Sequence, residues 1–98
     1  MKFEWDQPKD RMNRAKHEVT FTEACGVFAD SMHLSLFDPG HSQEEDRWMT
    51  LGISLTGKVL VVAHTYRETG GKETVRIISA RKANPNESKE YFSRRKGL

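Results

Sequence analysis

Two kinds of hydrophobic pattern alternate along the chain and predict both strands and helices. Residues 2–6 alternate between apolar and polar side chains, which predicts a short strand. An acidic cap, Asp6, with a proline two positions later predicts that a helix follows, over residues 9–17. Only Met12 and Ala15 are apolar in this helix, so we expect it to lie on the surface with one thin apolar stripe facing inward.

A second helix is predicted after a two-residue connection and ends near Asp30. Its apolar residues recur at helical spacing, and Thr20 and Glu23 are spaced as the two partners of a capping box. Only Glu18 and Val19 separate the two helices. We therefore expect a helical hairpin.

The second half of the chain predicts an antiparallel meander and a final helix. Residues 47–56, 58–66 and 74–82 each alternate or form short apolar runs, as strands do. The pair Gly70-Gly71 is typical of a hairpin turn between the last two strands. Asn84, followed by proline and, at the third helical position, glutamate, predicts the start of the last helix.

This order of elements predicts an α+β fold: a small antiparallel β-sheet, an N-terminal helical hairpin packed on one face, and a C-terminal helix. A chain of 98 residues fits one domain over residues 1–98, in which residues 94–98 are expected to form a frayed tail. Apolar strand positions should form the core with the second helix. The predicted core consists of Met49, Leu51, Ile53, Leu55, Val59, Val61, Val75 and Ile77, packed against Phe21, Val27 and Phe28.

Charge is unevenly distributed along the chain. Residues 75–98 contain seven basic and two acidic residues, whereas the net charge of the whole chain is only +2. A local positive end is typical of a phosphate-binding surface, and a solvated C-terminal helix explains it equally well. The single cysteine, Cys25, permits no intrachain disulfide, and no stretch resembles a signal peptide or a membrane span. We therefore expect a cytoplasmic protein, with Cys25 as a small buried residue.

No pattern predicts a metal site or a cofactor. The four histidines are scattered, without a partner at ligand spacing, and no glycine-rich phosphate loop is present. Two possibilities remain: a metal-free acid–base site or a binding surface. Metal-independent RNA cleavage needs a base for the 2′-hydroxyl, an acid for the leaving 5′-oxygen and cations around the phosphorus.

Candidates for these tasks gather near the last strand and the last helix. Arg81, Lys82, Glu87 and Tyr91 lie within eleven positions. Arg81 has the parity of the apolar residues of its predicted strand, and this conflict favours a function for it. The alternatives are structural: Glu87 as a capping-box residue, Tyr91 as a ring at the core edge, and His17 as a residue that ends the first helix.

A succession of motifs over residues 2–92 resembles the BrnT toxin family. The motifs are Phe3-Glu4-Trp5-Asp6, Lys9, Asn13, Lys16-His17, Val19-Thr20-Phe21, Glu23-Ala24, Val27-Phe28 followed by Asp30, Asp38-Pro39 with His41-Ser42, Glu45-Asp46-Arg47-Trp48, Leu51-Gly52, and Arg76 to Ala83 followed by Glu87 and Tyr91. At position 18, where the family often has glycine, this chain has glutamate.

The resemblance implies a RelE-like fold and a toxin that blocks translation by cutting RNA. It also implies a complex with a BrnA-type antitoxin, whose ribbon-helix-helix module binds operator DNA, so that the toxin reaches DNA only indirectly. We expect acidic and apolar side chains of this partner to meet Arg81 and the last helix. The alternative function is a catalytically inactive module that binds nucleic acid or antitoxin and acts mainly in operon autoregulation; a structural or adaptor domain is the third.

The predicted site combines both lines of argument. Arg81 is expected on the scissile phosphate, with Glu87 or His17 as the base. The predicted catalytic residues are His17, Arg81, Glu87 and Tyr91, and the predicted RNA-binding residues are Lys16, Arg47, Arg76, Ser79 and Lys82.

Overall fold

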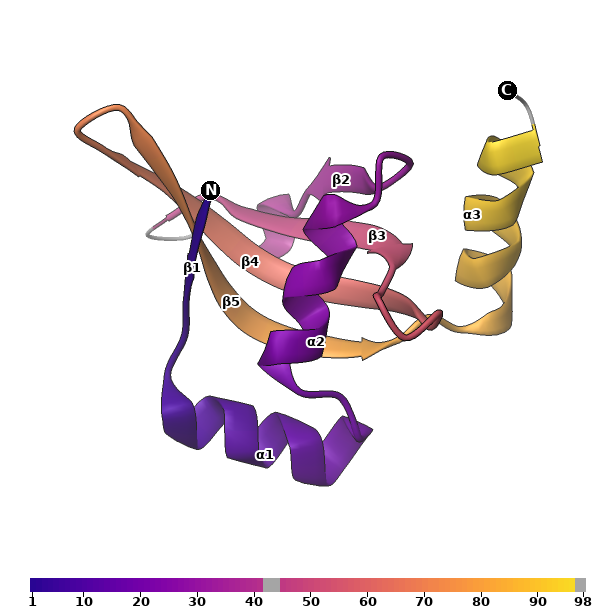
Figure 1. Ribbon diagram of the computed structural model, residues 1–98, viewed down its shortest axis with the longest axis horizontal. Helices are drawn as coiled ribbons and strands as arrows, with labels where there is room; N and C mark the ends of the chain where they lie inside the picture. Colours follow the sequence, from indigo (N-terminus) through magenta and orange to yellow (C-terminus); the bar gives the residue numbers. More distant parts are fainter. Residues whose placement is uncertain (42–44, 97–98) are drawn as a thin grey trace.

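In the computed structural model, which describes residues 1–41 and 45–96, five strands form one sheet in the order β1-β5-β4-β3-β2 (Figure 1). Helices and short 3₁₀ segments connect or flank the strands. The elements are β1 (Lys2–Glu4), α1 (Gln7–His17), α2 (Phe21–Cys25), η1 (Gly26–Ala29), β2 (Leu34–Phe37), η2 (Pro39–His41), β3 (Arg47–Ile53), β4 (Val59–Thr69), β5 (Lys72–Lys82) and α3 (Pro85–Lys96).

The sheet is mixed, so the expectation of a purely antiparallel sheet is wrong. Strands β2 to β5 form the predicted antiparallel meander, but β1 pairs parallel to β5, with Phe3 opposite Val75. The chain runs from β1 into α1, which lies along the edge of β5 (Figure 1). The alternation of residues 2–6 indicates a strand but carries no information on the direction of its partner.

The two N-terminal helices do not form a hairpin stacked on the sheet. Figure 1 shows α1 lying crosswise to α2 along the free edge of β5. Its inward residue is Asn13, not Met12, whose side chain is 71% exposed, or Ala15. The Asn13 amide accepts a hydrogen bond from the Ala80 N–H at 3.0 Å and donates to the Ala80 and Val19 carbonyls at 2.8 and 2.9 Å. Hydrogen bonds to an edge strand therefore hold α1 where an apolar stripe was expected.

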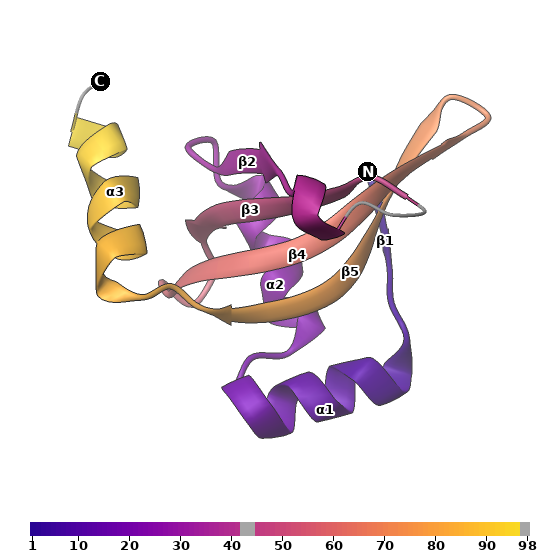
Figure 2. The ribbon, with the colours of Figure 1, turned by 180° about the vertical axis from the view of Figure 1, so that it is seen from behind.

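The two faces of the sheet are covered unequally. The first, which we name the closed face, packs against α2 and η1. Its fully buried residues are Val19, Phe21, Ala24, Val27, Leu60, Val62, Val75, Ile77 and Ala80. The second, which we name the open face, carries a smaller buried cluster of Leu51, Val61 and Tyr91, and Ala63 and Thr65 of β4 are buried there as well. Seen from behind, α3 stands at one margin of this face (Figure 2).

This division corrects the predicted core. Val75, Ile77, Phe21 and Val27 do pack together, with Phe28 at the margin of the cluster. The other predicted strand residues lie on the open face and not under α2, because successive side chains of a strand point to opposite faces. These residues are Met49, Leu51, Ile53, Val59 and Val61.

Element ends also differ from the prediction in two places. Strand β3 ends at Ile53, so Leu55 lies in the following turn and is 87% exposed instead of buried. Helix α3 extends through Lys96, so residues 94–96 are helical and only 97–98 of the predicted tail fall outside the described residues. The glycine hairpin is confirmed: Gly70 and Gly71 have φ of 60° and 80°, as a turn of this type requires. No helix among residues 1–41 and 45–96 is long and apolar enough to cross a membrane.

Candidate functional site

An irregularity in the pairing of β4 with β5 decides which side chains reach the open face. Ala63 lies opposite Ser79, but the next residue, His64, lies opposite Ile77. Ile78 is therefore an extra residue in β5, as in a β-bulge. Because of this extra residue, the odd-numbered residues of β5 point to one face of the sheet before Ile78 and to the other face after it.

Because of the bulge, Arg81 does not share the face of Val75. Arg81 lies opposite Val61, which belongs to the open face, whereas Val75 is buried on the closed face. The expected conflict between a charged residue and an apolar face is therefore absent. The side chain of Arg81 is 39% exposed.

The same bulge aligns three predicted site residues along β5. Arg76 lies opposite Thr65, Ser79 opposite Ala63, and Arg81 opposite Val61. These β4 partners are each two residues apart, so the three side chains project from the open face at intervals of about 7 Å. Without the extra residue, Arg76 would face the other way from Ser79 and Arg81.

Two further arginines, Arg47 and Arg67, lie near Arg76, at the end of the line away from Arg81. Thr65 of β4 is also opposite Arg47 of β3, so Arg47 and Arg76 belong to one cross-strand row on the open face. Arg76 pairs with Glu4 of β1 at 3.7 Å, and Arg67 approaches the same carboxylate at 3.6 Å. The row is therefore cationic with one anionic partner at its edge.

Arg81 and Glu87 form a close, two-fold contact where β5 leads into α3. Nη1 of Arg81 donates to Oε1 of Glu87 at 2.7 Å, and Nη2 donates to Oε2 at 3.0 Å. The hydrogen bonds from Arg81 hold the pKa of Glu87 below its ordinary value, against the effect of burial. The same contact raises the pKa of Arg81. Glu87 is thus an anion held in place.

Glu87 also completes the predicted capping box. Its N–H donates to Oδ1 of Asn84, and its Oε1 accepts from the N–H of Asn84, both at 2.8 Å. The structural interpretation of Glu87 is therefore confirmed in geometry. The Glu87 carboxylate therefore both caps α3 and binds the guanidinium of Arg81.

Tyr91 lies in the core and not in an accessible site. It is 1% exposed, packs with Leu51 and Val61, and its hydroxyl donates to a carboxylate oxygen of Asp30. The same Asp30 oxygen accepts from the N–H of Ile53 at 2.9 Å. Tyr91 therefore anchors α3 to the sheet, which agrees with the core-edge alternative.

His17 and Lys16 lie apart from the Arg81–Glu87 pair. They line a shallow groove between α1 and β5, together with Lys9 and Ser79. His17 is half-buried there, and Lys16 is exposed. Ser79 therefore lies between the two predicted groups. It shares the groove with His17, and it shares the open face of β5 with Arg81, two residues further along the strand.

Lys82 does not belong to the line of Arg76, Ser79 and Arg81 on the open face. Its ammonium group approaches Glu18 at the end of α1, at 3.7 Å. Lys82 lies opposite Leu60, which belongs to the closed face.

A sequence profile described as "Ribonuclease toxin, BrnT, of type II toxin-antitoxin system" matches residues 5–87 of the chain. The chain belongs to the BrnT family. A crystal structure of the Brucella abortus ribonuclease toxin BrnT is similar, with a TM-score of 0.58 and 26% sequence identity; the match covers 86% of this chain and 97% of that one. A search of curated proteins gives no significant match. The resemblance in sequence is thereby confirmed, and a ribonuclease toxin of a type II toxin–antitoxin system is the activity class of the family.

Two residues of this BrnT chain hold the site together but were not singled out for it from the pattern. Asn13 fixes α1 against Ala80 of β5, and Asp30 fixes α3 through Tyr91. Asn13 belongs to the BrnT-like motifs, and a buried polar residue in a polar helix leaves no periodic signal. Asp30 also belongs to these motifs, but its partners Ile53 and Tyr91 are distant along the chain, so the sequence pattern does not indicate them.

Neither Cys25 nor a metal cluster within the described part of the BrnT chain offers competing chemistry. The thiol of Cys25 donates to the Phe21 carbonyl at 3.2 Å, and burial raises its pKa, so a thiolate is disfavoured. Among residues 1–41 and 45–96, no three His, Cys, Asp or Glu side chains are grouped so as to hold a metal ion.

Proposed function

We propose that the chain is a cytoplasmic endoribonuclease toxin that cleaves RNA on the open face without a metal ion. A BrnA-type ribbon-helix-helix antitoxin neutralises it and connects it to operator DNA. The observation that carries the proposal is the β-bulge at Ile78, which sets Arg76, Ser79 and Arg81 in one line on an exposed sheet surface. An open surface of this kind suits a polymer substrate.

Phosphate binding falls to the arginines of this line. A guanidinium has five N–H donors in a fixed plane. Arg81 uses three of them, for the two Glu87 oxygens and, at 3.4 Å, for the Lys82 carbonyl. The remaining two can bind the scissile phosphate while Glu87 keeps the plane oriented. Arg47 and Arg76, with Lys16 and Ser79, bind neighbouring backbone groups, and Lys82 contributes charge at the margin.

Proton transfer is assigned to His17 in preference to Glu87. Both oxygens of Glu87 accept hydrogen bonds from Arg81, which weakens it as a base, whereas His17 brings a ring nitrogen that can accept a proton into the groove that Ser79 also lines. His17 takes the proton of the 2′-hydroxyl, the 2′-oxygen bonds to phosphorus, and the bond to the 5′-oxygen breaks. That oxygen leaves with a proton from solvent, since the Tyr91 hydroxyl bonds to Asp30.

The test is cleavage of RNA by the purified chain, with and without a metal chelator. We expect cleavage that the chelator does not reduce, and growth arrest with RNA degradation when the chain is expressed without its antitoxin. Abolition by the chelator would contradict the metal-free mechanism. RNA binding without cleavage would favour the inactive-module alternative, which the existing pairing of Arg81 with Glu87 makes worth testing.

A further inference from the structure

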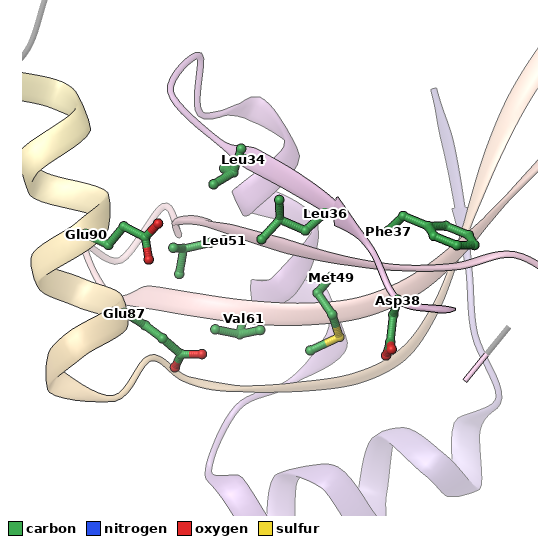
Figure 3. Close-up of a pocket in the computed structure, with 9 residues that line it drawn as sticks. All are labelled: Leu34, Leu36, Phe37, Asp38, Met49, Leu51, Val61, Glu87 and Glu90. Atoms are coloured by element: carbon green, nitrogen blue, oxygen red, sulfur yellow. The ribbon is translucent and has the colours of Figure 1, made fainter. Parts of the chain in front are cut away.

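The open face carries an apolar groove of about 360 Å³ between β2 and α3 (Figure 3). Its floor comes from three neighbouring strands. The apolar lining residues on these strands include Leu34, Leu36, Met49, Leu51 and Val61. Leu36 is 56% exposed, although β2 pairs it directly with Met49.

This groove is the part of the open face that α3 leaves uncovered. Tyr91 of α3 covers Leu51 and Val61, but Leu36 stays in solvent. The apolar face of a sheet is normally covered by a second layer of elements, and a contiguous exposed apolar surface marks an interaction site. A second helix laid beside α3 would complete the layer.

Carboxylates stand at both ends of the groove. Glu87 and Glu90 of α3 point toward it from one end, and Asp38 lies at the other, with the apolar floor between them (Figure 3). Glu87 is paired with Arg81, whereas Glu90 is exposed. The exposed Glu90 beside the apolar floor disfavours a polyanion such as RNA there and favours a segment that carries a basic residue next to an apolar stripe.

We propose that the groove binds an amphipathic helix of the antitoxin. Its apolar side chains cover Leu36 and Met49, and a lysine or arginine of the helix reaches the exposed Glu90. The proposal rests on the function as a toxin given above. The sequence led us to expect acidic antitoxin residues near Arg81, whereas the groove calls for basic ones. The reason is that Arg81 already has a carboxylate partner in Glu87.

The position of the groove also explains neutralisation. Val61, on its floor, is directly opposite Arg81. A helix in the groove therefore lies beside the guanidinium that is proposed to bind the scissile phosphate. RNA and antitoxin then exclude each other by overlap at Arg81, although their main contacts are on different parts of the open face.

The experiment measures binding of the separately purified antitoxin, encoded beside this chain, to matched variants. Leu36→Asp and Glu90→Lys change the groove. Met12→Asp and Glu73→Lys make the same changes at exposed positions outside it. We expect the two groove variants to weaken the complex about tenfold or more, and the two controls to leave it unchanged. Circular dichroism checks that all variants fold.

The outcomes separate this inference from the proposed function. RNA cleavage by free Leu36→Asp should equal that of the unmodified chain, since the groove does not bind RNA. Unchanged antitoxin affinity of both groove variants overturns the inference, and so does no antitoxin binding at all. Loss of RNA affinity in Leu36→Asp also overturns the inference and indicates that the groove binds RNA. If the unmodified chain self-associates and Leu36→Asp converts it to a monomer, the inference is overturned in favour of a second copy of the chain in the groove. Absence of cleavage with intact, groove-dependent binding overturns only the proposed enzymatic function.

Discussion

Arg81 and Glu87 are joined by two parallel hydrogen bonds, between the last residues of β5 and the first turn of α3. Because Glu87 also caps α3 through Asn84, the guanidinium is held by a carboxylate that cannot turn away without opening the helix end. The pair lies beside the proposed RNA line and beside the apolar groove. Under the two proposals above, it is the point at which bound RNA and the antitoxin helix would overlap.

Replacement of Arg81 by lysine should be nearly as harmful as replacement by alanine. Lysine keeps the charge but cannot bind two phosphate oxygens and Glu87 in one plane. We expect about a 100-fold or greater loss of the cleavage rate for Arg81→Lys and for Arg81→Ala. The measurement is RNA cleavage by folded protein. Stability should change by less than about 1 kcal/mol, because the pair is partly exposed. Activity near normal in Arg81→Lys would argue against phosphate binding by the planar guanidinium.

Glu87→Gln distinguishes the three tasks open to this residue. Glutamine also completes a capping box, so the helix should persist. It removes the charge that orients Arg81, and we expect roughly a tenfold loss of the cleavage rate, equivalent to about 1.4 kcal/mol, with an unchanged pH profile. The measurement is the cleavage rate against pH. A loss of 100-fold or more together with loss of the acid limb would identify Glu87 as the base, and full activity would leave it only the cap.

His17→Gln should remove the proton acceptor. We expect a loss of about 100-fold in the cleavage rate and the disappearance of the acid limb of the pH–rate profile. Lys16→Gln is the control from the same groove: it should weaken RNA binding but keep the shape of the profile. If His17→Gln retains the acid limb, another group accepts the proton.

Local sequence signals predicted the N-terminal caps of the helices well. Asp6 caps α1 by accepting from the Lys9 N–H, and Thr20 accepts from the Glu23 N–H, as their spacing indicates. The second half of that capping box is absent, however. The Glu23 carboxylate accepts from Ser54, at 3.1 Å, and from Thr56 in the turn after β3. A tertiary contact thus takes a side chain that local rules assign to its own helix.

The candidate site was less predictable, because it depends on pairing between strands. The side of the sheet that Arg81 faces is set by the extra residue Ile78, and this is defined only against Ala63 and His64 of β4. The parity of β5 alone gives the wrong face. The parallel direction of β1 is likewise a property of the pair and not of either strand.

Glu18→Gly should stabilise the protein. Glu18 ends α1 with φ of 59° and ψ of 29°, in the left-handed region that favours glycine. Glycine removes the strain of about 1 kcal/mol, and the greater entropy of the unfolded chain and the loss of the exposed contact with Lys82 offset part of this gain. We expect a net increase of roughly 0.5 kcal/mol in the free energy of unfolding, measured with urea. Glu18→Ala is the control, since it loses the ion pair but keeps the strain, and a Glu18→Gly chain no more stable than Glu18→Ala would contradict the argument.

His64 should make the fold sensitive to acid. It is 0% exposed; Nε2 lies 2.5 Å from Oγ1 of Thr50, and Thr50 continues the contact to Ser35 at 2.7 Å. The pKa of His64 is lowered to about 4, mainly because burial disfavours the charged ring; a backbone hydrogen bond at Thr65 opposes this effect and the charge of His33 adds to it. The neutral ring is therefore favoured in the folded chain.

The sign of the effect follows from this lowered pKa. The unfolded chain binds a proton at His64 near pH 6.5, and the folded chain only near pH 4, so the stabilisation is fully present above pH 6.5 and is lost as the pH falls toward 4. A shift from 6.5 to about 4 corresponds to a loss of roughly 3 kcal/mol, at about 1.4 kcal/mol per pKa unit. Urea unfolding at a series of pH values measures it, and His64→Gln, which cannot titrate but can still bond Thr50, supplies the control. The difference between the two curves isolates His64 from the carboxylates that titrate in the same range. Parallel curves between pH 6.5 and 4 would show that His64 has the same affinity for protons in the folded and unfolded chains.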